Sequence, residues 1–116
     1  MQELDAERIE EFGFTAPQLK ELLGNYRDSL WVDFEQILAL SQNDPSQELV
    51  SMLHSFKGMV SLFAKPTLVD WVARSEQAAQ SSLQLGDASL VDHLEGLKAK
   101  LAQLHTEVQM YLDTLQ

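Results

Sequence analysis

The stretch that decides the fold reads LVSMLHSFKGMVSLF and runs from Leu49 to Phe63. At the helical period of about 100° per residue, its large apolar side chains fall in one stripe, which predicts a helix with a buried face. The stripe consists of Leu49, Leu53, Phe56, Val60 and Phe63, with Met52 and Met59 on its flank. His54, Lys57 and Ser61 share the opposite side, which we expect to face water. Gly58 lies beside them.

Gly58 is unexpected inside this helix, because glycine in a helix interior costs roughly 1 kcal/mol relative to alanine. The apolar stripe continues past it to Phe63, so Gly58 does not stand at an evident helix end. We infer that the position needs space, so that a partner can approach the backbone one turn after His54. Lys57 would place a cation close to any negative group bound at His54.

The string HSFKG, from His54 to Gly58, resembles the signature of histidine-containing phosphotransfer (HPt) domains of bacterial two-component relays. That signature is a histidine followed by a lysine three residues later and a glycine four residues later, on a helix of a four-helix bundle. The resemblance extends from about Thr15 to the C-terminus, because the order and lengths of the expected helices also fit. The chain departs from the pattern at Phe63, where the family often has a second glycine. We therefore expect a different helix exit there and a difference in part of the docking surface.

The resemblance implies that the protein is a phosphorelay intermediate. His54 would accept a phosphoryl group from an aspartate of a receiver domain, often on a hybrid sensor histidine kinase, and pass it to an aspartate of another receiver. A neutral imidazole suits this role because one ring nitrogen is free to attack phosphorus. Lys57 would offset the phosphoryl charge, since phosphoryl transfer depends chiefly on positioning and electrostatics. The receiver domains would bring Mg²⁺, so the bundle itself would need no cofactor and no metal.

Two further polar residues are candidates for supporting roles. Ser61 lies two turns beyond His54 on the same face, where it is either a docking contact or a solvated serine. Glu76 falls where the family often has a carboxylate or an amide on the following helix. It would orient the His54 ring through a hydrogen bond or a water molecule, and the alternative is an ordinary surface glutamate.

Apolar and histidine residues complete the candidate set. Val50, Met59 and Leu62 would form an exposed apolar rim for a receiver helix, although Met59 is equally placed to flank the core. His93 and His105 are expected to be partly buried spacers or surface residues. The chain has no Gly-rich phosphate loop and no kinase ATP motif, so we predict a phosphocarrier and not an enzyme.

Composition limits the classes of function. The 116 residues are enough for one domain, predicted to span residues 1–116. The net charge of −10 argues against nucleic acid and against an anionic membrane as partners. Against this acidic background, Lys57 and Lys65 stand out as positive charges near His54. Cysteine is absent, so there is no disulfide framework and no thiolate metal site. No apolar run approaches the ~20 residues of a membrane span, and the acidic segment Met1–Glu11 is unlike a secretory signal, so we expect a cytoplasmic protein.

Capping residues divide the first half of the chain. Residues 3–12 are predicted to form a short helix, with Leu4 on its apolar side, that Gly13 interrupts. The segment Thr15–Gln18 has the pattern of a capping box with proline just inside it, which predicts the start of a long helix ending near Gln42.

Turn residues divide the second half in the same way. Asp44 and Pro45 are predicted to cap and begin the helix of His54, which would run to about Phe63. Lys65 and Pro66 mark the next start. The side chains expected to point inward from that helix are Leu68, Val72, Ala79 and Leu83. Gly86 is predicted to take the left-handed conformation at its end, and Asp87 to cap the last helix.

The last helix has the most regular pattern in the chain. Steps of four and three residues separate Leu90, Leu94, Leu97, Leu101, Leu104, Val108, Tyr111 and Leu115. This spacing fits a coiled coil and also fits the seam of an antiparallel bundle. The short connections favour the bundle. We therefore predict an all-α, antiparallel up-down-up-down four-helix bundle with a short additional N-terminal helix, and we expect a monomer.

Two other functions are compatible with the sequence. In the first, the protein is a helical adaptor that binds a receiver domain or a histidine kinase without carrying phosphate. The presence of Phe63 in place of the expected glycine is the reason to consider it. In the second, the protein is a coiled-coil assembly protein whose association is driven by the last helix.

Overall fold

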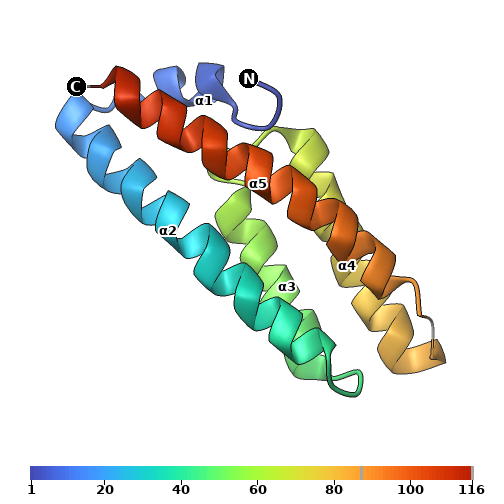
Figure 1. Ribbon diagram of the computed structural model, residues 1–116. Coiled ribbons are helices and arrows are strands. Elements are labelled where there is room, and N and C mark those ends of the chain that lie inside the picture. Colours follow the sequence, from blue (N-terminus) through green and yellow to red (C-terminus); the bar gives the residue numbers. More distant parts are fainter. Residues whose placement is uncertain (87, 116) are drawn as a thin grey trace.

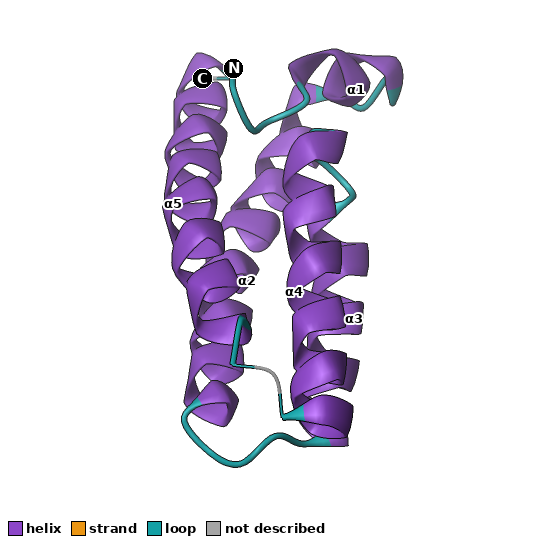
Figure 2. Cartoon of the chain, turned by 90° about the vertical axis from the view of Figure 1, so that its right-hand side faces the viewer, coloured by secondary structure: helices purple, strands orange, loops and turns teal. Residues whose placement is uncertain are grey.

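Four long helices stand side by side, and a short fifth one crosses their end. The computed structural model describes residues 1–86 and 88–115. Within these residues, α1 spans Ala6–Glu11, α2 Ala16–Ser41, α3 Gln47–Val60, α4 Pro66–Leu85 and α5 Leu90–Thr114. Consecutive long helices pack together, and α5 closes the ring by packing on α2. The helices alternate in direction, and α1 lies across the end of the bundle where both termini are found (Figures 1 and 2). The predicted architecture is confirmed.

The apolar stripes of the four helices meet in one core. All five stripe residues predicted for α3 are buried, and so is the row from Leu90 to Val108 on α5. Tyr111 and Leu115 pack against this core while partly exposed. The leucine row of α5 therefore forms the seam of a bundle within one chain. Leu83 was wrongly predicted to point inward, because near the end of α4 it is 37% exposed.

The predicted helix starts hold at α2 and differ at α3. Thr15 and Gln18 form the expected capping box, with both reciprocal hydrogen bonds present. At α3 the N-cap is Ser46 and not Asp44, because Ser46 has the extended backbone of a cap and its Oγ accepts the Leu49 N–H at 3.2 Å.

Gly86 ends α4 with the predicted left-handed backbone, at φ 70°. The capping role predicted for Asp87 lies outside the described residues. The molecule measures 48 × 21 × 20 Å. Among the described residues, none of the helices combines the length and apolar character that crossing a membrane requires.

The N-terminal segment is the main departure from the predicted elements. A helix from residue 3 was expected, but α1 begins only at Ala6. Residues 1–5 are non-helical, and Leu4 forms an antiparallel bridge with Ala64 in the connection between α3 and α4. We call residues 1–5 the strap. Its backbone groups find partners elsewhere in the fold, as described below, so it has no need of helical hydrogen bonds.

Candidate functional site

The face of α3 that points away from the core carries the candidate site. Burial of the stripe turns Leu53 and Phe56 inward, and His54 between them points outward. The His54 side chain is 68% exposed, so a partner can reach the ring. The ring stands in the middle of α3, with six further helical residues before the helix ends at Val60. A regular helix therefore fixes the backbone beneath it.

The carboxylate of Glu76 contacts both His54 and Lys57 on this face. Glu76 reaches across from α4, with Oε2 3.2 Å from His54 Nδ1 and Oε1 3.1 Å from Lys57 Nζ. An ionised carboxylate can only accept hydrogen bonds, so Nδ1 carries the proton and donates it. The lone pair is then left on Nε2, the other ring nitrogen. The structure thus brings together the three residues that the sequence pattern placed on separate turns and helices.

Gly58 leaves open space one turn after His54. A Cβ atom added at Gly58 would meet no heavy atom within 4 Å. No neighbouring part of the fold therefore requires glycine at this position. Ser61 is the C-cap residue of α3, and its hydroxyl donates to the Gly58 carbonyl at 2.7 Å. This bond gives Ser61 a local role in ending the helix; its predicted contact with a partner stays a prediction.

One expectation about the surroundings of His54 is wrong. Val50 is not part of an exposed rim, because α3 packs against both α2 and α4 and its buried face is wider than the stripe; Val50 is only 6% exposed. The Lys65 ammonium group donates to the Met1 carbonyl in the strap; its predicted contribution of positive charge near His54 stays a prediction. Leu62 is exposed as predicted, and Met59 packs partly buried against the core.

Phe63 occupies the position where a glycine was expected, and it serves the core. Its ring packs edge-on against Tyr26, with centroids 5.0 Å apart, and against Phe12 at 5.9 Å. The Tyr26 hydroxyl donates to the Val60 carbonyl at 2.7 Å, and burial raises the pKa of this phenol well above its ordinary value. The exit of α3 is therefore fixed by packing between rings; the expectation that it differs from the exit usual in the family stays a prediction.

An apolar groove opens beside this helix exit, and sequence reasoning missed most of it. It encloses about 360 Å³ and is lined chiefly by Phe12, Phe14, Leu22, Met59, Leu62 and Phe63. We call it the apolar groove. Four of these side chains are among the large apolar residues that the fold leaves exposed: Phe12, Phe14, Leu22 and Leu62. The sequence feature that could have indicated the groove is the pair of phenylalanines on either side of Gly13. Helix periodicity does not predict where such residues in a turn will point.

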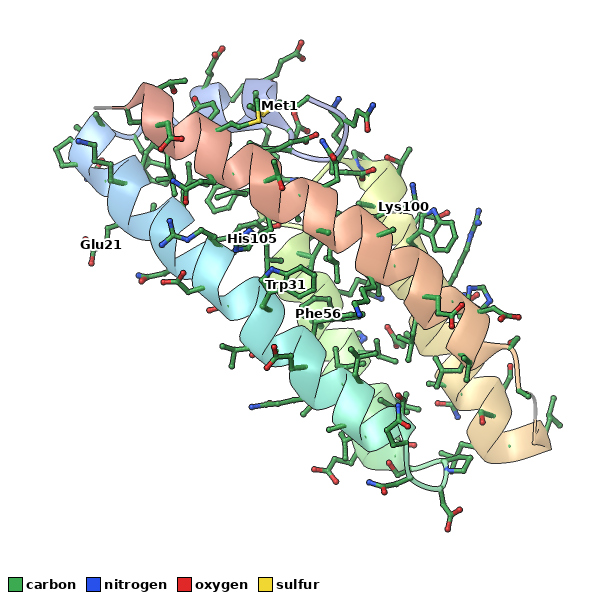
Figure 3. The ribbon with its side chains drawn as sticks, in the orientation of Figure 1. Met1, Glu21, Trp31, Phe56, Lys100 and His105 are labelled. Carbon is green, nitrogen blue, oxygen red and sulfur yellow. The ribbon has the colours of Figure 1, made fainter. Side chains whose placement is uncertain are left out.

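The other two histidines stand beside tryptophans on the α5 side of the bundle. His105 lies 6.0 Å from Trp31, and His93 lies 6.5 Å from Trp71, between ring centroids. Figure 3 shows Trp31 and His105 side by side between α2 and α5. Both histidines are partly buried, as predicted. Within residues 1–86 and 88–115 there is no group of three or more His, Asp or Glu side chains arranged to hold a metal ion.

Comparison with known proteins agrees with this geometry. A family model described as an Hpt domain matches residues 21–115, which is most of the chain and includes α3, α4 and α5 entire. No curated protein and no solved structure matches the chain.

Proposed function

The chain belongs to the family of Hpt domains, which act in histidine phosphotransfer within phosphorelays, and from this premise we propose that His54 is its phosphoryl acceptor. The observation that carries the proposal is the shared carboxylate of Glu76, which holds an exposed imidazole and an ammonium group together. His93 and His105 are partly buried against tryptophans, so they are weaker candidates.

The proposed reaction takes the phosphoryl group from a receiver aspartate. The Nε2 lone pair attacks phosphorus, and the bond between phosphorus and the aspartate oxygen breaks, with the electron pair leaving on the carboxylate. Nδ1 keeps its proton, so the phosphorylated ring is positively charged and Glu76 stabilises it. The same steps in reverse deliver the group to the aspartate of a second receiver.

Lys57 has a different part in the proposal. Its ammonium group is held 3.1 Å from Glu76 Oε1, one turn from His54 on the same face. A cation fixed there offsets the negative oxygens of the group in transfer, and electrostatic stabilisation of this kind is the main source of catalysis in phosphoryl transfer. Gly58 leaves the approach to the ring unobstructed.

We assign partner docking to the exposed face of α3 together with the apolar groove. The partner is a receiver domain, and the part of it that enters the groove is an apolar face of one of its helices. Leu62 links the two regions, because it lines the groove and follows the last residue of α3, Val60, by two residues. An exposed groove with large aromatic and aliphatic walls fits such a helix. Gly58 and Ser61 lie between the ring and Leu62 along the chain.

The proposal also covers the metal ion, the partner kinase, the location and the oligomeric state. The receiver domains bring Mg²⁺, and the chain works as a carrier with no cofactor or ATP site of its own. The first receiver belongs to a hybrid sensor kinase. The protein acts in the cytoplasm as a monomer.

Incubation with a phosphorylated receiver domain tests the proposal. The protein should acquire label that is lost in acid, and His54→Gln should abolish it. His93→Gln is the matched control and should keep the label. Label that survives His54→Gln would reject His54 as the acceptor. Failure of the unaltered protein to acquire label from several competent receivers, while still binding them, would instead favour an adaptor that carries no phosphate.

A further inference from the structure

A buried carboxylate on α5 holds the N-terminal end of the chain. Glu107 is only 3% exposed. Its Oε1 accepts the backbone N–H groups of Glu3 and Leu4, both at 2.8 Å, and its Oε2 accepts that of Gln2 at 3.0 Å. The Gln103 side chain donates a further bond to Oε2 at 2.7 Å. One side chain therefore satisfies successive amides of a segment more than a hundred residues away in sequence.

The opposite edge of the strap is held by the connection between α3 and α4. The Asp5 N–H donates to the Phe63 carbonyl, and the Lys65 N–H donates to the Glu3 carbonyl, both at 2.8 Å. The strap thus lies between α5 on one side and the exit of α3 on the other. Figure 3 shows Met1 beside α5 at this end of the bundle.

The strap leads directly into one wall of the apolar groove. Asp5 is the N-cap of α1, since its side chain accepts the Arg8 N–H at 3.1 Å. Phe12 is the C-cap residue of α1, and its ring meets Phe63 edge-on. Phe14 follows at a centroid distance of 5.4 Å from Phe12. A change in the position of the strap therefore moves α1, and with it the two phenylalanines that line the groove.

The carboxylate of Glu107 is suited to holding the strap because it is charged and both of its oxygens accept hydrogen bonds. Burial raises the pKa of the Glu107 carboxyl, but the hydrogen bonds from Gln103 and from the strap outweigh burial and bring the pKa below its ordinary value. An apolar residue at this position would leave the three strap amides without partners, which is costly for buried groups. The core seam nearby, formed by Leu104 and Val108, needs no such charge.

We propose that Glu107 is a positioning residue for partner docking: through the strap it fixes α1 and so the Phe12 wall of the apolar groove. This inference rests on the proposed function, because it concerns how a receiver reaches His54. Glu107 takes no part in the chemistry at His54. Its removal therefore affects the concentration of receiver needed for transfer and leaves the rate at saturation unchanged.

The test compares Glu107→Gln with the unaltered protein and with Glu95→Gln, a matched change at an exposed carboxylate of the same helix. Glutamine has one acceptor oxygen and turns a donor group toward the strap amides. We expect the backbone amides of Glu3 and Leu4 to exchange hydrogen faster, and the KM for phosphorylated receiver to rise about tenfold with kcat unchanged, which is the pattern of lost binding. Glu95→Gln should change neither quantity.

A second variant separates docking from general stability. Leu4 and Ala64 face each other in the antiparallel bridge, without direct hydrogen bonds between them, so their Cα atoms lie close enough for a disulfide. Leu4→Cys and Ala64→Cys, added to Glu107→Gln, should restore a low KM when the thiols are oxidised and lose it again on reduction. The chain has no other cysteine to interfere.

The outcomes are distinct. Faster exchange in the strap with an unchanged KM would overturn the proposal, as would a fall in kcat at constant KM. Unchanged exchange in Glu107→Gln would overturn the premise that the carboxylate holds the strap. A KM that oxidation of the introduced cysteines does not restore would show that Glu107 acts by another route. Absence of label in the unaltered protein would instead reject the proposed function itself.

Discussion

Replacing Gly58 should separate the stability of the bundle from access to His54. Gly58 lies in the last turn of α3, which ends at Val60 and not near Phe63 as predicted, and it is exposed; a Cβ atom there meets nothing within 4 Å. Alanine therefore gains helix propensity without a clash, and the free energy of unfolding should rise by about 0.5–1 kcal/mol. For a domain of this size that corresponds to an increase in Tm of about 2–4 °C.

Leucine at the same position should give a stable protein that transfers poorly. Its side chain would stand on the His54 face, about 6 Å along the helix from the imidazole. A receiver that must bring its aspartate to the ring would meet this side chain first. We expect the Tm of Gly58→Leu to equal or exceed that of the unaltered protein, and its transfer rate at low receiver concentration to fall more than about tenfold, the cost expected of a steric block in an interface core.

Gly96 provides the matched control for the stability measurement. It also lies inside a long helix, but a Cβ atom there would stand 2.5 Å from the Trp71 ring. Gly96→Ala should therefore lower the free energy of unfolding by about 1 kcal/mol, because the overpacking cost exceeds the gain in propensity. Thermal unfolding followed by circular dichroism, with transfer from a labelled receiver, measures both effects. Loss of stability in Gly58→Ala, or unchanged transfer in Gly58→Leu, would refute the reasoning about open space.

Three further predictions concern charged groups. Glu76→Gln should slow transfer roughly fivefold, since a hydrogen-bonded ion pair at a partly exposed site is worth about 1 kcal/mol; single-turnover transfer measures this, and an unchanged rate would remove Glu76 from the mechanism. Lys57→Ala should slow transfer and shift the free energy of unfolding by less than about 0.5 kcal/mol, because its side chain is partly exposed and its ammonium group makes one partly exposed ion pair. A large drop in Tm would show that the Lys57 side chain contributes to the stability of the bundle. The lowered pKa of Glu107 means that its carboxylate stabilises the fold at pH above the ordinary value of 4.5, and that this contribution is lost as pH falls through the lowered pKa. Glu107→Gln should therefore lose less stability than the unaltered protein when thermal unfolding is followed into acid, and parallel pH profiles for the two proteins would contradict this.

The helices and the central site were predictable because their information is local. The stripe from Leu49 to Phe63 sets which side of α3 is buried, and this alone turns His54 outward. The capping box at Thr15 and the left-handed Gly86 depend on a few neighbouring residues. Val50 was misjudged because its burial depends on a second neighbouring helix, which periodicity within α3 does not reveal.

The choice between caps for α3 was not decidable from composition alone. Asp44 and Ser46 both have side chains suited to an N-cap, and it is the extended Ser46 whose side chain accepts a helical amide. The apolar groove was hidden for a related reason. Gly13, at φ 68°, turns the chain between Phe12 and Phe14 so that their rings meet, and a turn of this kind has no periodic signal.

The departure at Phe63 and the unexpected strap are parts of one structural feature. A glycine at residue 63 would leave the exit of α3 without a ring to pack on Tyr26 and Phe12. With phenylalanine there, the exit is anchored, and its carbonyl is held where it can accept the Asp5 N–H. The strap then has a fixed edge to pair with, and Glu107 supplies the other edge. The residue that motivated doubt about phosphotransfer thus lies away from the chemistry of His54, and its effect falls on the wall of the groove where a partner would dock.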